Sequence, residues 1–202
     1  MHLLAVPSLP EIRLYTAHPA SGLRRLTWNG GAPYWAYQWA GGVALARHIL
    51  DRPEIVRGRR VLDLGAGSGI VGIAAAKSDA AEVLAAEIDP NAVAALRLNA
   101  QANDVVVTPI AHDLTTGPAL DVDIVLVGDL FYARDLAKRV LGFLERCSVA
   151  GSSVLIGDPG REYLPRERLD LIAEYKVSDV GEARGMAAKQ GGVFSLRVAV
   201  VA

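Results

Sequence analysis

The 202-residue sequence is short of several features, and each shortage excludes a class of protein. Its one cysteine, Cys147, cannot form a disulfide within the chain or build a cysteine-based metal site, so we expect it to pack in the core. The four histidines have no metal-ligand spacing with cysteine or carboxylate partners, and no metal is predicted. No apolar stretch approaches the roughly 18 residues of a membrane-spanning helix.

An excess of positive charge is also missing. The formal net charge is −1 and the isoelectric point is about 6.4, which leaves no electrostatic footprint for DNA or RNA. The first residues lack a basic start, and Pro7 and Pro10 interrupt their short apolar run, so no signal peptide is predicted. We therefore expect a cytoplasmic protein that binds neither nucleic acid nor membrane.

The amino-acid pattern of residues 1–38 differs from that of residues 39–202. Residues 1–38 are rich in proline, glycine and aromatic residues, and we interpret them as an N-terminal extension that could close over a substrate. From residue 39 to 202 short apolar runs alternate with helix-like segments, which predicts one domain. Strands are expected at 59–64, 82–87, 105–110, 122–128 and 152–158, and helices at 40–50, 69–77, 90–103 and 134–148.

The apolar strands are nearly continuous, which is typical of a parallel sheet buried on both faces by helices. The tail differs, because residues 173–182 and 191–202 look like two strands joined by a short loop that contains glycine. Such a loop cannot hold a crossover helix, so the last pair of strands is predicted to be antiparallel. The fold class is therefore α/β, with a mostly parallel sheet and a C-terminal antiparallel pair.

The strongest motif is "VLDLGAGSGIVGIAAA" at 61–76, where a strand leads through Gly65, Gly67 and Gly69 into an alanine-rich helix. In open α/β sheets, ligands bind beyond the carboxyl ends of the strands, and glycines there let the backbone approach the ligand. Glu87 ends the next strand about 20 residues later, where a carboxylate can accept hydrogen bonds from ribose hydroxyls. The motif predicts a nucleotide-like cofactor.

Two cofactor classes use this arrangement. The run from Gly67 to Gly72 fits G-x-G-x-x-G, the pattern of nicotinamide dinucleotide sites. Asp63 argues against a dinucleotide, because its carboxylate would repel a pyrophosphate but attract the α-ammonium of S-adenosylmethionine. S-adenosylmethionine is therefore the predicted cofactor; a dinucleotide, or a turn whose glycines only pack, stays as an alternative.

Residues 38–202 resemble the seven-β-strand, class I methyltransferases, and Asp63 with the three glycines matches their first motif. The resemblance implies a Rossmann-like fold with a seven-stranded sheet and helices on both faces. It also implies that Glu87 binds the cofactor ribose and that Asp113 lies near the adenine amine, between His112 and Leu114. Asp113 could instead simply begin the turn "DLTTGP".

A second motif, "VGDLFY" at 127–132, ends the fourth strand with Asp129 and Tyr132. The simplest use of Asp129 is to start a loop or cap a helix. An ionised carboxylate at this strand end also suits a cationic acceptor such as a lysine ammonium. The pattern resembles the D-x-x-Y/F signature of seven-β-strand protein-lysine methyltransferases.

The segments "PYWAYQWAGGVALARHILD" (33–51) and "IGDPGREYLP" (156–165) are similar to the branch that methylates the β-subunit of electron transfer flavoprotein. By that resemblance Trp39 lines the cofactor pocket and the partner is the flavoprotein β-subunit. Asp129 is expected to orient the substrate lysine for in-line methyl transfer, with Tyr132 and Phe131 as walls of the lysine channel.

Two other functions stay open. One is methylation of a small nitrogen compound of the pyridine or nicotinamide type, and the other is a catalytically silent, cofactor-binding protein of the same fold. Further assignments are undecided: Asp158 could line the acceptor cleft or cap a loop, and Arg161 could contact an acidic protein substrate or be an ordinary surface residue. Trp28, Trp35 and Tyr37 could form a lid or simply pack.

Overall fold

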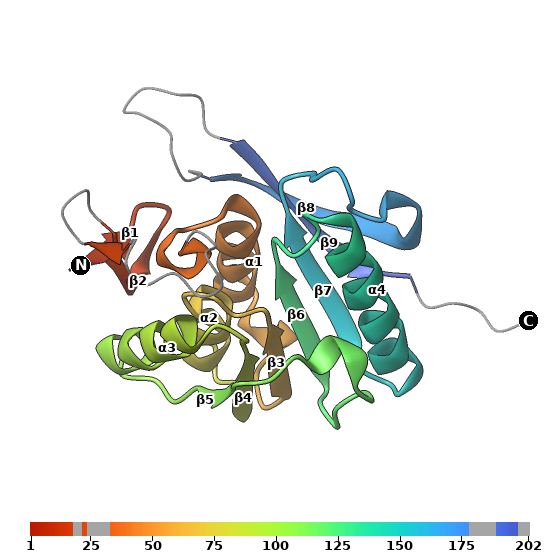
Figure 1. The fold of residues 1–202 in the computed structure, drawn as a ribbon, viewed down its shortest axis with the longest axis horizontal. Helices are drawn as coiled ribbons and strands as arrows, with labels where there is room; N and C mark the ends of the chain where they lie inside the picture. Colours follow the sequence, from red (N-terminus) through yellow and green to blue (C-terminus); the bar gives the residue numbers. More distant parts are fainter. Residues whose placement is uncertain (18–21, 24–32, 178–188, 198–202) are drawn as a thin grey trace, which may run out of the picture.

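A computed structural model describes residues 1–17, 22–23, 33–177 and 189–197. Its centre is a seven-stranded sheet with the strand order β5-β4-β3-β6-β7-β9-β8 (Figure 1). Within this sheet β3, β4, β5, β6 and β7 are parallel, and β9 pairs antiparallel with both β7 and β8. The strands are β3 Arg60–Leu64, β4 Glu82–Ala86, β5 Thr108–Ile110, β6 Ile124–Gly128, β7 Ser153–Asp158, β8 Leu169–Val177 and β9 Lys189–Leu196.

Helices cover both faces of the sheet. Val61 and Leu62 are neighbours in β3, yet Val61 packs in the core beneath α1, α2 and α3, whereas Leu62 packs in the core beneath α4. This alternation explains why the strand sequences are apolar throughout. The helices are α1 Ala40–Asp51, α2 Ile70–Lys77, α3 Pro90–Ala102 and α4 Arg134–Val149, with short 3-10 turns η2 Tyr34–Ala36, η3 Pro53–Ile55, η4 Leu114–Thr116 and η5 Arg166–Arg168.

The predicted fold class is confirmed, and most predicted elements lie within one or two residues of the observed ones. The exception among the parallel strands is β5, which covers only Thr108–Ile110 because Val105 still donates to the carbonyl of Ala100 at the end of α3. β8 begins at Leu169, four residues before the predicted 173. Parts of the last two predicted strands, 178–182 and 198–202, and most of the loop between them lie outside the described residues.

The sequence analysis missed a β-hairpin in the N-terminal segment, formed by β1 His2–Val6 and β2 Leu9–Thr16. Leu9, Ile12 and Leu14 are fully buried in the core that α1–α3 share with the sheet. The open edge of β2 is completed by side chains of α3: the amides of Arg13 and Tyr15 donate to the Asn103 and Asn99 side chains, each at 2.9 Å. The domain boundary at residue 38 stays a prediction.

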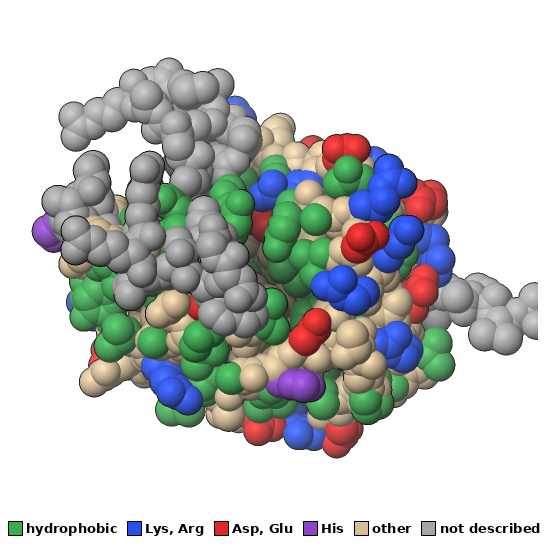
Figure 2. Space-filling model, in the orientation of Figure 1, with side chains coloured by type: hydrophobic (Ala, Val, Ile, Leu, Met, Phe, Trp, Pro, Cys, Tyr) green, Lys and Arg blue, Asp and Glu red, His purple; other side chains and the backbone are tan. Residues whose placement is uncertain are grey.

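Figure 2 shows the same face as Figure 1, with a hollow near its middle that hydrophobic side chains border. Cys147 is fully buried in the core beneath α4, as predicted. Within the described ranges no helix has both the length and the apolar character to cross a membrane.

Glycines bring the start of α1 onto the ends of β6 and β7. A Cβ on Gly41 would collide with the carbonyl oxygen of Gly157, and a Cβ on Gly157 would collide with the carbonyl oxygen of Gly41. A Cβ on Gly128 would lie 3.0 Å from the Cα of Gly42. These are contacts between two backbones, which cannot give way as a flexible side chain can. The approach therefore depends on the absence of side chains at these positions.

Replacing Gly41 with alanine should destabilise the fold by about 1–3 kcal/mol, because the new methyl group overpacks a backbone contact. Gly142 is the matched control, since it lies inside α4 and a Cβ there would meet only the Arg146 side chain, at 3.6 Å. Gly142→Ala should stabilise by about 0.5–1 kcal/mol through helix propensity. Urea unfolding of both variants measures the difference; equal effects would contradict the packing argument.

Candidate active site

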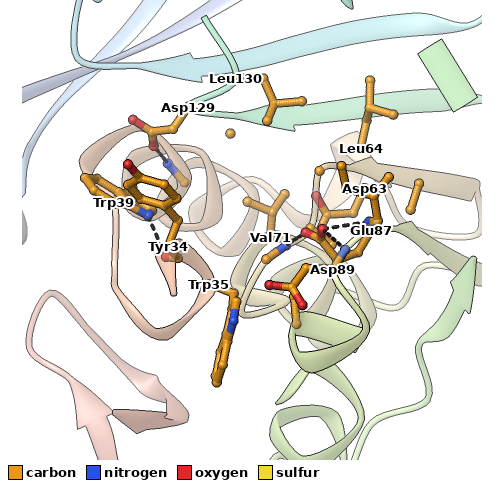
Figure 3. A pocket seen from close by; sticks show the side chains of 18 of the residues that line it. Tyr34, Trp35, Trp39, Asp63, Leu64, Val71, Glu87, Asp89, Asp129 and Leu130 are labelled. Atoms are coloured by element: carbon orange, nitrogen blue, oxygen red, sulfur yellow. Dashed lines mark hydrogen bonds between the residues drawn. The ribbon is translucent and has the colours of Figure 1, made fainter. Parts of the chain in front are cut away.

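A cavity of about 500 Å³ opens at the carboxyl ends of the parallel strands, within the volume range of small-molecule sites. Eight of the residues predicted for the site line it: Trp39, Asp63, Gly65, Gly67, Glu87, Asp113, Asp129 and Tyr132. Gly69, which precedes the adjoining helix, and Phe131 do not. Figure 3 shows that Asp63, Glu87 and Asp89 lie on one side of the cavity and Asp129, Trp39 and Tyr34 on the other. The site thus has two halves.

The glycine loop shapes the first half. Gly65, Gly67 and Gly69 all have positive φ, at 70°, 51° and 83°, a conformation that side chains disfavour. The amides of Gly65 and Ala66 both donate to the carbonyl of Ala86 at the end of β4, at 2.9 and 3.0 Å. The loop therefore folds back across the neighbouring strand before α2 begins.

Glu87 holds this loop in place. Its Oε2 accepts a hydrogen bond from the amide of Gly67 at 2.9 Å, and its Oε1 accepts from the amides of Ile88 and Asp89 at 2.7 and 3.0 Å. One carboxylate thus joins the end of β4 to the glycine loop. Asp89 caps α3 through the amide of Asn91, with Pro90 in the first turn.

Asp63 is buried beneath the loop, with 1% of its surface exposed, and its Oδ2 accepts from the amide of Gly72 at 2.8 Å. Burial raises the pKa of Asp63 to about 7 and nearby Glu87 adds to this, although the Gly72 hydrogen bond opposes the shift. A carboxylate in this position is stabilised by a positive partner. It therefore fits the α-ammonium of S-adenosylmethionine.

Asp113 begins a turn, which is the alternative role that its sequence context left open. Its Oδ1 accepts from the amide and the hydroxyl of Thr115, at 2.9 and 2.6 Å, and so starts the turn η4. Burial raises the pKa of Asp113, but the hydrogen bonds from Thr115 outweigh it and leave the pKa below its ordinary value. Asp113 still lines the cavity beside His112 and Leu114, so its predicted place near the adenine stays a prediction.

In the second half, Asp129 follows β6 with a positive φ of 59°, which is uncommon for a residue with a side chain. Its amide donates to the carbonyl of Gly157 at 3.0 Å, and its Oδ2 accepts from the amide of Gly42 at 2.7 Å. Trp39 occupies the N-cap position of α1 but supplies no side-chain cap. Asp129 therefore caps α1 from a distant strand, and its carboxylate is only 6% exposed.

Arg161, which the sequence analysis left undecided, binds the other oxygen of Asp129. Its Nη2 and Nε lie 2.6 and 3.1 Å from Oδ1, and its guanidinium carbon lies 5.5 Å from the centre of the Trp39 ring. Burial raises the pKa of Asp129 to about 6, even though Arg161 and the Gly42 hydrogen bond lower it. The carboxylate is therefore ionised at neutral pH with a cation already in place.

Aromatic rings surround this ion pair. The centre of the Tyr34 ring lies 5.9 Å from that of Trp39 and 6.4 Å from that of Tyr132, and Trp39 Nε1 donates to the carbonyl of Tyr34 at 2.9 Å. Tyr132 is 56% exposed, at the mouth of the cavity. Sequence reasoning gave Tyr34 no role, because only its distance in space from Tyr132 and Trp39 distinguishes it from the aromatic residues around it.

Two assignments can now be decided. Phe131 is not a channel wall, since it is fully buried beneath α4, while Leu130 lines the cavity instead. Asp158 caps a loop: its Oδ1 accepts from the amides of Gly160 and Arg161, both at 2.7 Å.

Trp35 packs against Ala92 and Ala95 of α3 and, like Tyr37, also lines the cavity, so a lid formed by these two residues stays a prediction. Trp28 lies outside the described residues. Among the described residues no group of His, Cys, Asp and Glu could hold a metal ion.

The raised pKa of Asp63 predicts how stability depends on pH. Between the unfolded pKa near 3.9 and the folded value of about 7, the folded protein keeps a proton that the unfolded chain has lost. Ionisation of Asp63 therefore costs stability as the pH rises through this window. Asp63→Asn should be more stable than the native chain by about 1–3 kcal/mol at pH 8, and by less toward pH 4. Urea unfolding without cofactor at pH 5, 6.5 and 8 tests this, and a difference independent of pH would contradict it.

Comparison with known proteins identifies the family to which the chain belongs. Residues 45–144 match the family model described as ribosomal protein L11 methyltransferase. The electron transfer flavoprotein beta subunit lysine methyltransferase of Xenopus laevis is 42% identical over 187 residues, which cover 86% of this chain and 74% of that protein. The Homo sapiens protein of the same name is 43% identical over 177 residues, covering 83% of this chain and 68% of the human protein.

Among solved structures, magnesium protoporphyrin IX methyltransferase from Synechocystis PCC 6803 with bound SAM is similar to 88% of this chain and 92% of its own, with a TM-score of 0.55 and 14% identity. At that identity the likeness shows the fold alone. The family relatives are methyltransferases, which confirms S-adenosylmethionine as the cofactor, so the dinucleotide alternative is set aside. The chain belongs to the electron transfer flavoprotein beta subunit lysine methyltransferase family, whose members are S-adenosylmethionine-dependent protein-lysine methyltransferases.

Proposed function

We propose that this protein transfers methyl groups from S-adenosylmethionine to lysine side chains of the electron transfer flavoprotein β-subunit. The observation that carries the proposal is the ionised carboxylate of Asp129, buried in an aromatic half-cavity next to the cofactor half. Relatives named for this substrate are about 40% identical over most of the chain. A cytoplasmic location, with no nucleic acid or membrane partner, stays a prediction.

The second half of the cavity suits a long cationic side chain. Tyr132 and Tyr34 are 56% and 59% exposed, so a lysine can approach along aromatic rings that favour its apolar stem and its charge. At the end of that path Asp129 offers the only carboxylate among the described residues that line this half. The carboxylate attracts the ammonium and orients its nitrogen by a charge-assisted hydrogen bond.

The bound cofactor supplies a methyl group already activated by its sulfonium, so the protein mainly has to position the reactants. The lysine must also lose a proton, and an unperturbed lysine has a pKa of about 10.4. Burial lowers the pKa of a lysine, whereas the negative charge of Asp129 raises it. With its own pKa at about 6, Asp129 is a weak base at neutral pH. We therefore assign Asp129 the role of orienting the lysine and propose that water accepts the lysine proton.

Asp129→Asn should lower kcat/KM for the flavoprotein β-subunit about 10- to 100-fold, the worth of one charge-assisted hydrogen bond. Asparagine can still accept from the amide of Gly42, so α1 stays capped and cofactor binding should be retained. The measurement is transfer of isotope-labelled methyl from S-adenosylmethionine to the purified β-subunit, with calorimetry of S-adenosylhomocysteine binding.

Asp121→Asn is the matched control, because Asp121 is an exposed carboxylate that pairs with Arg60 at the opposite end of the sheet. It should leave turnover unchanged. Full activity in Asp129→Asn would refute the orienting role of Asp129. Label that appears only in small molecules of a cell extract, and never in protein, would refute the lysine substrate.

A further inference from the structure

The carboxylate of Asp129 already forms an ion pair with a side chain of the same protein, that of Arg161. Oδ1 of Asp129 accepts from both Nη2 and Nε of Arg161, at 2.6 and 3.1 Å, and Oδ2 accepts from the amide of Gly42 at 2.7 Å. A carboxylate oxygen has two lone-pair sites, so Oδ1 has no capacity left. Oδ2 has one site left, but it faces the start of α1, where it lies 2.6 Å from the position that a Cβ on Gly41 would take. A lysine ammonium therefore cannot bind Oδ1 while Arg161 stays on it.

Arg161 also has the surroundings expected for a substrate lysine. Its guanidinium lies over the ring of Trp39, in the same half-cavity as Tyr34 and Tyr132. The Arg161 side chain is 23% exposed, against 7% for that of Asp129, so it lies on the solvent side of the carboxylate. An approaching lysine would meet Arg161 first.

A hydrogen bond to Asp158 fixes the backbone of Arg161, whereas its side chain is held through its guanidinium group. Asp158 Oδ1 accepts from the amides of Gly160 and Arg161, both at 2.7 Å, and Gly160 has a φ of 92° that suits glycine. Asp158 is itself fully buried at the end of β7. The guanidinium can therefore leave Asp129 by rotation about side-chain bonds, with no movement of the loop.

We propose that Arg161 is an internal stand-in for the substrate lysine: its guanidinium holds the acceptor position on Asp129 and must be displaced by the incoming ammonium. The proposal rests on the proposed function, because it takes Asp129 as the lysine site. It makes Arg161 a specificity-determining residue. A cationic side chain can exchange with Arg161 charge for charge, whereas a neutral group would leave the buried carboxylate without a partner.

The most direct test replaces Arg161 with a residue whose nitrogen can accept the methyl group. In Arg161→Lys the new ammonium should occupy the acceptor position, so the enzyme should methylate itself at position 161 when given labelled S-adenosylmethionine and no other substrate. The carbon–sulfur bond breaks, a nitrogen–carbon bond forms, S-adenosylhomocysteine is released and the displaced nitrogen proton goes to water. Mass spectrometry should find label at position 161, and none there in the double variant R161K/D129N.

Arg168→Lys is the matched control, because Arg168 pairs with the carboxylate of Glu145 on the exposed surface, at 2.7 Å. It should not become labelled at position 168. An Arg161→Lys enzyme that methylates the flavoprotein β-subunit but not itself would overturn the proposal. A native enzyme that methylates no lysine at all would instead overturn the proposed function, so the two failures are distinguishable.

A binding measurement tests displacement without turnover. Arg161→Met removes the competing cation but keeps an unbranched apolar stem, so n-butylammonium, a lysine side-chain mimic, should bind at least tenfold more tightly than to the native protein. Calorimetry is done with S-adenosylhomocysteine present and at pH 8.5. The high pH is needed because loss of Arg161 leaves Asp129 facing only the Gly42 amide and the like charge of Asp158, which raises the pKa of Asp129 further.

R161M/D129N should lose this binding. The KM for the flavoprotein β-subunit should also fall about tenfold in Arg161→Met at pH 8.5, with kcat changed less than threefold. A higher KM in Arg161→Met, restored by Arg161→Lys, would mean that Arg161 contacts the substrate directly and would overturn displacement. Unchanged KM and unchanged n-butylammonium binding would overturn it as well.

Discussion

The carboxylate of Asp129 is the interaction on which the rest of the site depends. It is nearly buried, so it must be paired and hydrogen-bonded to be tolerated. Gly42 supplies a hydrogen bond from the first turn of α1, and Arg161 supplies the positive charge from the loop after β7. One side chain thereby joins three parts of the fold at the point where we propose that the acceptor binds. The glycine contacts between α1 and the ends of β6 and β7 bring these parts close enough for that pairing.

Two buried carboxylates divide the cavity by function. Asp63 and Asp129 end neighbouring parallel strands, β3 and β6, and burial raises the pKa of the first to about 7 and of the second to about 6. Each is more easily ionised when a cation lies beside it. In the proposed function, the cofactor half offers its carboxylate to an ammonium on the methyl donor, and the acceptor half offers its carboxylate to lysine. The reaction needs those two cationic molecules close together, and the alternation of carboxylates lowers the electrostatic cost of that approach.

The segment in front of α1 belongs to the site as much as the sheet does. Tyr34 and Trp39 contribute rings to the acceptor half, and Trp35 anchors the same stretch against α3. Further back, β2 is bound to α3 through the side chains of Asn99 and Asn103, which complete its hydrogen bonding. The N-terminal hairpin therefore packs against the helix that follows Glu87, the residue that holds the glycine loop. This links the start of the chain to the cofactor half.

The sequence alone determined the features that local patterns encode. Apolar runs alternating with helical segments specify the parallel sheet, and the glycines of the first motif specify a cofactor loop. Asp63 is recognisable because it precedes those glycines, and Glu87 and Asp129 because each directly follows a strand. Only the tertiary structure decided which distant side chains meet. Gly128 and Gly157 are partners in the parallel register, so Asp129 and Asp158 follow side by side, and the loop capped by Asp158 turns Arg161 onto Asp129 across 32 positions.

The positive φ of Asp129 changes the direction of the chain, so that Leu130 faces the cavity and Phe131 faces the core. The residue types alone do not show this change in chain direction. The physical reason is range: periodicity, capping and glycine turns act within a few residues, whereas pairing of buried charges depends on strand register and on backbone geometry at the ends of strands.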